Sequence, residues 1–341
     1  MSKIVITGAN GFVGSHILEA ARTETRHQWI AACRKPDKLP MTFGGEVRCG
    51  DLRDKGYRAE MLSGVDVVIH AAAWTSLWGH HKQSRELFYE PSAALLEDAV
   101  RAGVKRFVFL STTSALPSGF VGAGLSGVQP AFWPHLCNVV AIENHMRELA
   151  SNQTTMVSLR CGLFAGKRYN LGLLPILLPR LKTHLVPWIA GGCTSMPIVA
   201  GTDLGQAFVK AAIVDQLNGY EQFQIVGPEV PTAREVIDYL HADFGYPRPH
   251  FSVPFPIGYV FAALMEHLDR LVPWEPLVVR SIIHLLEETC PDNGPAMKRL
   301  GYQPETGWKR AIDDQLAEMK HRQQQPMKMA VSEGDEFRRL E

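Results

Sequence analysis

Lys3-Ile4-Val5-Ile6-Thr7-Gly8-Ala9-Asn10-Gly11-Phe12-Val13-Gly14 is the stretch that decides the fold. An apolar run typical of a strand ends at a glycine-spaced loop, and the apolar residues that follow recur at helical spacing. The three glycines permit a tight turn, a close backbone approach to a pyrophosphate and close packing of helix on strand. The start of the helix would then direct N–H groups and its positive dipole end toward the anion. Because the spacing is G-x-x-G-x-x-G, an ordinary strand-to-helix turn is the alternative.

Composition narrows the class of protein. The chain has 341 residues, 46% hydrophobic and 21% charged, with 35 basic and 35 acidic side chains. This profile is typical of globular enzymes and argues against nucleic acid as the main partner. Six cysteines are scattered without metal-ligand spacing, which predicts reduced thiols and a cytoplasmic protein. The early first strand leaves no room for a secretory signal, and no apolar span suits a bilayer.

Strand-like and helix-like segments alternate over the first half of the chain. We expect further strands at 28–33, 46–49, 65–70, 106–111 and 155–160. This order predicts an α/β fold with a doubly wound parallel sheet, whose ligands bind beyond the carboxyl ends of the strands. We predict a dinucleotide-binding domain at 1–165 and a smaller, mainly helical substrate lobe at 166–321 that partly returns to the first domain. A disordered tail is expected at 322–341.

Residues directly after the second and third strands are candidate cofactor ligands. Arg34 and Lys35 follow the second strand, where a guanidinium can clamp a 2′-phosphate and an acidic residue would hold a 2′-hydroxyl. The pair therefore favours NADP(H) over NAD(H), with a solvated basic loop as the alternative. Asp51 is placed to accept a hydrogen bond from an adenine amino group while Leu52 packs on the ring.

Three motifs together resemble those of the extended short-chain dehydrogenase/reductases. They are the glycine-rich turn, Gly50-Asp51-Leu52-Arg53-Asp54, and His70-Ala71-Ala72 after the fourth strand. The resemblance covers nearly the whole chain and implies a Rossmann-type fold. It is closest to the 3β-hydroxysteroid dehydrogenase-like branch of the epimerase/dehydratase superfamily, through the aromatic loop 74–79, the apolar C-terminal helices and the segment 298–304. It implies cofactor contacts at Gly8, Asn10, Gly11, Phe12, Val13, Gly14, Arg34, Lys35, Asp51, Leu52, His70, Ala71, Ala72 and Val139.

The catalytic region departs from the pattern that the resemblance implies. Family members carry a Ser or Thr after the fifth strand and then Tyr-x-x-x-Lys, often followed by a Glu. Here Thr112 takes the hydroxyl position, with Ser111 as the substitute. Counting back from Glu143 places Val139 at the lysine position and His135 at the tyrosine position. The family asparagine position holds Phe88, followed by Pro91 and Ser92 in place of a Gly-Thr pair.

Histidine offers a physical reason for losing tyrosine and lysine together. A tyrosine with a pKa near 10 needs a neighbouring cation to transfer protons at neutral pH, whereas an imidazole titrates near 6.5 without that help. We therefore predict that His135 donates or accepts the proton while Thr112 orients the substrate oxygen. The alternatives are a catalytically degenerate NAD(P)-binding protein without hydride transfer, and a non-redox epimerase or lyase.

Aromatic residues near the predicted site favour a bulky, hydrophobic or aromatic small-molecule substrate. The candidates for its contacts are Trp74, Trp78 and Trp133. His80 and His81 lack the further ligands of a metal site. The apolar stretch 251–286 predicts a roof over the pocket or a peripheral contact with a membrane, with packing inside the domain or against a homodimer partner as the alternative. The predicted activity is an NADP(H)-dependent reduction of a carbonyl or oxidation of an alcohol.

Overall fold

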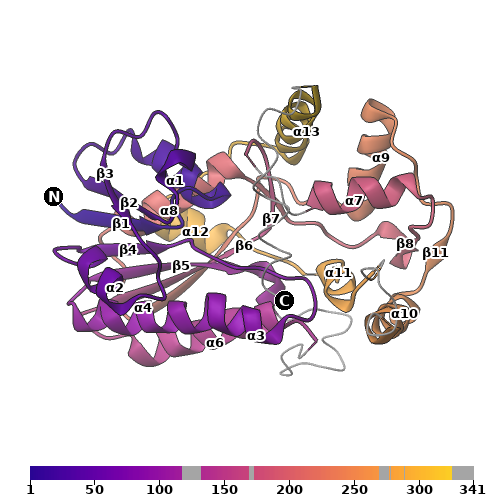
Figure 1. Ribbon diagram of the computed structural model, residues 1–341. Coiled ribbons are helices and arrows are strands. Elements are labelled where there is room, and N and C mark those ends of the chain that lie inside the picture. Colours follow the sequence, from indigo (N-terminus) through magenta and orange to yellow (C-terminus); the bar gives the residue numbers. More distant parts are fainter. Residues whose placement is uncertain (117–131, 169–172, 269–275, 277, 288, 325–341) are drawn as a thin grey trace.

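A seven-stranded parallel sheet forms the centre of the molecule (Figure 1). The computed structural model describes residues 1–116, 132–168, 173–268, 276, 278–287 and 289–324. The strand order is β10-β6-β5-β4-β1-β2-β3, which confirms the doubly wound Rossmann-type fold. The strands are β1 (Lys3–Thr7), β2 (Gln28–Cys33), β3 (Glu46–Cys49), β4 (Val67–His70), β5 (Arg106–Thr112), β6 (Thr155–Cys161) and β10 (Tyr220–Ile225).

Two helical layers cover the sheet because alternate strand residues point to opposite faces. Ile4 and Ile6 of β1 pack into one core with helices α1 (Phe12–Ala21), α8 (Gly201–Ile213) and α12 (Gly294–Leu300). Val5 packs into the other core with α2 (Lys55–Met61), α4 (Glu90–Arg101) and α6 (Pro134–Leu149). A short helix α3 (His81–Ser84) and a π-helical turn η2 (Arg85–Tyr89) precede α4.

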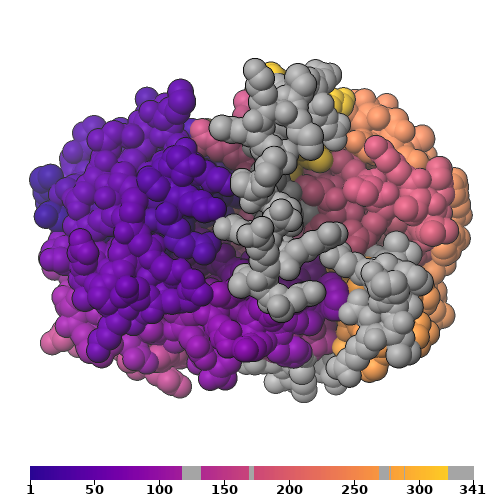
Figure 2. Space-filling view, viewed as in Figure 1, coloured from indigo at the N-terminus to yellow at the C-terminus, as the bar shows by residue number. Residues whose placement is uncertain are grey.

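A second lobe lies beside the carboxyl ends of the strands (Figures 1 and 2). It has a core of its own, built largely from α7, α9 and α13. Its elements include α7 (Leu173–Lys182), α9 (Ala233–Phe244), α10 (Phe255–Leu268), α11 (Arg280–Leu285), α13 (Trp308–Gln324) and two small sheets, β7 (Leu163–Ala165) with β9 (Ile198–Ala200) and β8 (Trp188–Ile189) with β11 (Ser252–Val253). Through α8, β10 and α12 the chain returns to the main sheet.

Most element boundaries agree with the prediction, and four differ, one of them β6, which ends at Cys161, one residue later than expected. β4 begins two residues later than expected. β5 ends one residue later, and α13 continues to Gln324 rather than ending near 321. The remainder of the predicted tail, 325–341, lies outside the described residues. Asp203 accepts a hydrogen bond from the Thr306 N–H at 3.0 Å, which gives this carboxylate a structural role.

Helix α10 is apolar on its outer surface as well as on its packed side. Val260 is 68% exposed, Ile257 60% and Leu264 53%, whereas Phe255 and Ala262 are buried. Within the described part of the chain, no helix combines the length and apolar character needed to cross a membrane. Contact of the region 251–286 with a membrane or a second copy stays a prediction.

Candidate active site

A large cleft of about 1360 Å³ runs between the carboxyl edge of the sheet and the second lobe. The sheet side supplies the glycine-rich turn and the residues after β2, β3, β4 and β5. The lobe side supplies apolar side chains from α7, α10 and α11, among them Ile176, Leu177, Phe261 and Ile282. Charged residues concentrate at the nucleotide end, which holds Arg34, Asp51 and Arg53, while Arg180 lies on the lobe side. The cleft is therefore polar at one end and apolar at the other.

The glycine-rich turn has the close packing that a pyrophosphate cradle requires. Gly8 has a φ of +66°, and a Cβ there would lie 2.7 Å from the backbone of Ala72. A Cβ on Gly14 would lie 2.2 Å from the Gly8 carbonyl oxygen. No side chain caps the N-terminus of α1 among the described residues, and this end of the helix lies at the cleft, where its positive dipole end favours an anion. The turn therefore fits a dinucleotide, with Gly8, Asn10, Gly11, Phe12 and Val13 lining the cleft and Gly14 packed beneath it.

An ion pair organises the nucleotide end of the cleft, where the sequence predicts the adenosine. Asp51 accepts a hydrogen bond from Arg53 Nη2 at 2.7 Å and another from the Arg53 backbone N–H at 2.9 Å. The side-chain hydrogen bond from Arg53 lowers the pKa of Asp51 to about 2. Arg34 lines the cleft beside this pair, whereas Lys35 does not line it and instead accepts a hydrogen bond from Asn10 Nδ2 with its carbonyl oxygen. Arg53 was not among the predicted cofactor contacts, although it stands two residues after Asp51.

His70 supports the cleft from below. Its Nδ1 lies 2.7 Å from Thr7 Oγ1 and its Nε2 lies 2.9 Å from Ser92 Oγ, so both ring nitrogens are engaged. Burial lowers the pKa of His70 to about 4, which keeps the ring neutral. Its side chain therefore braces β4 against β1 and α4. Ala71, Ala72 and Leu52 also line the cleft.

Glu143 has a structural role beside the part of the cleft that holds Thr112 and His135, the reaction end. It is 1% exposed and forms an ion pair with Arg160 at 2.6 Å. Ser111 Oγ donates to it at 2.7 Å and Ser158 Oγ donates at 2.6 Å. Although burial favours the protonated form, the hydrogen bonds and charge of Arg160 outweigh it and lower the pKa of Glu143. Because Ser111 is committed to this network, Thr112 is the better candidate for the substrate hydroxyl contact.

Thr112 has a hydroxyl hydrogen to offer to a ligand. Its Oγ1 accepts a hydrogen bond from the Ser114 N–H at 3.2 Å and so caps the short helical turn that follows β5. A hydroxyl that accepts one bond can still donate its own hydrogen to a second partner. Thr112 lines the cleft, so that donor can reach a substrate oxygen.

His135 differs from the prediction in its protonation. Burial lowers its pKa to about 4, and a backbone hydrogen bond with Trp74 only partly opposes the shift. An imidazole that titrates near neutral pH was expected, and the surrounding apolar side chains are the reason it does not. Nδ1 of His135 is buried without a hydrogen-bond partner among the described residues. His135 is therefore a neutral side chain with one N–H donor at the cleft.

Apolar side chains occupy the two positions where the resemblance predicted a lysine and an asparagine. Val139, at the lysine position, is 3% exposed and lines the cleft one helical turn after His135. Phe88, at the asparagine position, is 2% exposed, and its ring centroid lies 4.8 Å from that of His135. Phe88 lies in the π-helical turn η2, a distortion that is frequent at functional sites. This part of the cleft is therefore lined by fewer polar side chains than the resemblance predicted.

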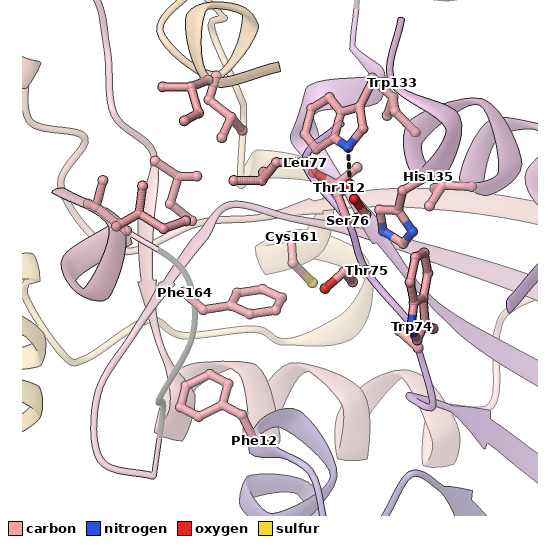
Figure 3. A pocket seen from close by; sticks show the side chains of 18 of the residues that line it. Phe12, Trp74, Thr75, Ser76, Leu77, Thr112, Trp133, His135, Cys161 and Phe164 are labelled. Atoms are coloured by element: carbon pink, nitrogen blue, oxygen red, sulfur yellow. Dashed lines mark hydrogen bonds between the residues drawn. The ribbon is translucent and has the colours of Figure 1, made fainter. Parts of the chain in front are cut away.

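An aromatic wall borders His135, as Figure 3 shows. Trp74 and Trp133 line the cleft, and Trp133 Nε1 donates to the Ser76 carbonyl oxygen at 2.8 Å. Phe12 and Phe164 lie across the cleft with their ring centroids 5.7 Å apart. Trp78 does not line the cleft, and its ring centroid lies 5.6 Å from that of His80. Of the three tryptophans predicted to contact substrate, two therefore reach the cleft.

Comparison with known proteins places this geometry in a family context. A family model described as "NAD dependent epimerase/dehydratase family" matches residues 4–225. The chain is similar to the 2-alkyl-3-oxoalkanoate reductase of Stenotrophomonas maltophilia, at 26% identity over 93% of this chain and 98% of the relative. It is also similar to isoform 1 of the 3beta-hydroxysteroid-dehydrogenase/decarboxylase of Arabidopsis thaliana, at 24% identity over 91% of this chain and 78% of the relative.

Solved structures share the fold at low sequence identity. The UDP-glucose 4-epimerase of Thermotoga maritima matches with a TM-score of 0.69 at 18% identity, over 94% of this chain and 99% of that one. The UDP-glucuronic acid 4-epimerase of Bacillus cereus, solved with UDP-glucuronic acid and NAD, matches with a TM-score of 0.68 at 19% identity and the same coverage. These likenesses support the fold alone.

Proposed function

The chain belongs to the NAD dependent epimerase/dehydratase family, and from this premise we propose that it is an NADP(H)-dependent oxidoreductase acting on a carbonyl or alcohol of a bulky hydrophobic molecule. The observation that carries the proposal is the single cleft that joins the glycine-rich turn to the aromatic wall at Trp74 and Trp133. A molecule in the apolar part would share that cleft with the reactive end of a dinucleotide.

The nucleotide end favours NADP(H). The second strand ends at Cys33 and is followed by Arg34, so no carboxylate stands where a 2′-hydroxyl would be held. Asp51, the nearest carboxylate along the cleft, is already paired with Arg53. A 2′-phosphate placed here would meet Arg34 and Arg53 together, and planar guanidinium groups suit phosphate.

Two neutral donors form the reaction end. Thr112 can donate its hydroxyl hydrogen, and the neutral His135 ring can donate its one N–H to a substrate oxygen. A bound nicotinamide would supply or accept the hydride at the substrate carbon. Hydrogen bonds from Thr112 and His135 would stabilise the negative charge that develops on the substrate oxygen during reduction. A neutral imidazole is a suitable electrophile for this purpose, because it needs no protonation at working pH.

Val139 favours a second candidate function. A lysine at this position would supply a charged contact to the cofactor ribose, and the buried valine cannot. A protein that binds the dinucleotide without transferring hydride would have this arrangement too. Dinucleotide binding alone therefore does not distinguish the two candidates, whereas isotope transfer does.

Deuterium transfer tests the proposal directly. The purified chain is incubated with NADPH carrying deuterium at C4 of the nicotinamide, as each stereoisomer in turn, and with two ketones, a 3-oxosteroid and a 2-alkyl-3-oxoalkanoate. We expect one stereoisomer to deliver deuterium to the new carbinol carbon, detected by mass spectrometry. Tight binding of NADPH without label in any product would instead identify a binding protein.

A further inference from the structure

Two thiols meet at the carboxyl ends of neighbouring strands. Cys33 ends β2, Cys49 ends β3, and the two are register partners in the parallel pair. As register partners in adjacent strands, their side chains leave the sheet on the same face. Neighbouring strands lie about 4.8 Å apart, which falls within the range of about 4.4–6.8 Å between the Cα atoms of disulfide-bonded cysteines. The pair is therefore placed to form a disulfide without a change of fold.

The two thiols differ in access. Cys49 is exposed, whereas Cys33 is 5% exposed, and burial raises the pKa of its thiol to about 11. The thiolate is the attacking form of cysteine, so an oxidant in solution meets Cys49 first. β3 is the edge strand of the sheet, and the end that carries Cys49 is bonded on one side only (Figure 1). Cys33 is then the resolving thiol.

The pair joins the two loops that form the adenosine end of the cleft. Cys33 directly precedes Arg34, and Cys49 precedes Gly50 and Asp51. All of these except Cys49 line the cleft. The space around them is tight, because a Cβ on Gly50 would lie 2.2 Å from the ring of Tyr57. Drawing the two sulfur atoms to about 2.05 Å therefore shifts at least one of the loops that carry Arg34 and Asp51.

We propose that Cys33 and Cys49 form a reversible disulfide that weakens dinucleotide binding. The oxidant is a small-molecule disulfide. The Cys49 thiolate attacks one of its sulfur atoms, forms a mixed disulfide and releases one thiolate. Cys33 loses its proton to solvent and attacks Cys49 Sγ, which forms the Cys33–Cys49 bond and releases the second thiolate. Two protein thiols are oxidised by two electrons, and the small disulfide is reduced to two thiols.

The experiment uses the full chain, first reduced and then treated with glutathione disulfide. We expect the unreduced peptide digest to contain a linked pair of peptides from Cys33 and Cys49, and the intact mass to fall by two hydrogens. NADPH titration followed by fluorescence should then show the dissociation constant of the oxidised protein raised by about tenfold. Dithiothreitol should restore the original value.

Matched variants separate the pair from the other thiols. Cys49→Ser should bind NADPH as the reduced protein does and should lose the response to oxidant, while Cys193→Ser, which removes another exposed thiol, should keep it. Glutathione retained on Cys49 without a link to Cys33, or a link that leaves the dissociation constant unchanged, would overturn the proposal. The expected loss of NADPH affinity rests on the proposed function. If the reduced chain binds neither NADPH nor NADH, this expectation and the proposed function both fail, whereas the mass measurement still decides whether the disulfide forms.

Discussion

The two ends of the cleft follow different rules. At the nucleotide end, backbone geometry makes the site: Gly8 and Gly14 are packed so closely that side chains are excluded. At the reaction end, side chains make the site, among them Phe88, His135 and Val139. A site made of backbone is retained or lost as a unit, whereas a site made of side chains can change residue by residue.

The largest effect on cofactor affinity is expected from filling the turn. Gly14→Val places its Cβ 2.2 Å from the Gly8 carbonyl oxygen. We expect NADPH affinity to fall by at least about 100-fold, or about 2.7 kcal/mol, measured by fluorescence titration. Gly44→Ala is the control, because nothing lies within 4 Å of a Cβ there. Unchanged affinity in a folded Gly14→Val variant would show that the dinucleotide binds elsewhere.

Glu143→Ala tests whether the glutamate at the reaction end is structural. Removing it leaves the partly buried Arg160 without its carboxylate, and losing one partner of such a pair costs up to about 3–5 kcal/mol. Chemical denaturation should show this loss in the free energy of unfolding, with NADPH affinity unchanged in the folded state. Glu46→Ala breaks an exposed pair with Arg48 and should cost less than about 1 kcal/mol. Equal losses in the two variants would contradict the structural role.

His135→Phe tests whether the reaction end is active. Removing one hydrogen-bond donor to a developing oxyanion lowers turnover by about 10²–10³-fold. We expect that loss in kcat with NADPH affinity unchanged. Because the pKa of His135 is about 4, wild-type turnover should be nearly constant from pH 5.5 to 8. Full turnover by the variant would leave Thr112 as the sole donor.

His70 should make the fold sensitive to acid. Its pKa is about 4 in the folded protein and near 6.5 when unfolded, so its contribution to stability is present above pH 6.5 and is lost as the pH falls toward 4. The loss amounts to about 3 kcal/mol at most, and His135 acts in the same direction. Urea unfolding at pH 7 and pH 4.5 measures it. His70→Asn should show a smaller difference between the two pH values, and an unchanged difference would assign the acid sensitivity to other groups.

Arg34→Ala should give the smallest effect. Loss of one guanidinium contact to a 2′-phosphate weakens NADPH binding by about tenfold, or about 1.4 kcal/mol, and leaves NADH binding nearly unchanged. Parallel titrations with the two cofactors measure the ratio. Arg22→Ala, a basic side chain at the end of α1, is the control. An equal loss for both cofactors would mean that Arg34 does not contact a 2′-phosphate.

The sequence by itself determined the order of strands and helices along the chain, the glycine-rich turn and the identities of the residues at positions 135 and 139. These depend on local patterns: apolar runs set the strands, and glycine spacing sets the turn. Tertiary structure alone decided what the substituted residues can do. The burial that makes His135 neutral, the pairing of Asp51 with Arg53 and the position of Trp78 outside the cleft depend on neighbours distant in sequence or on loop direction. A residue's identity is local, but its protonation and direction depend on the residues that fold around it.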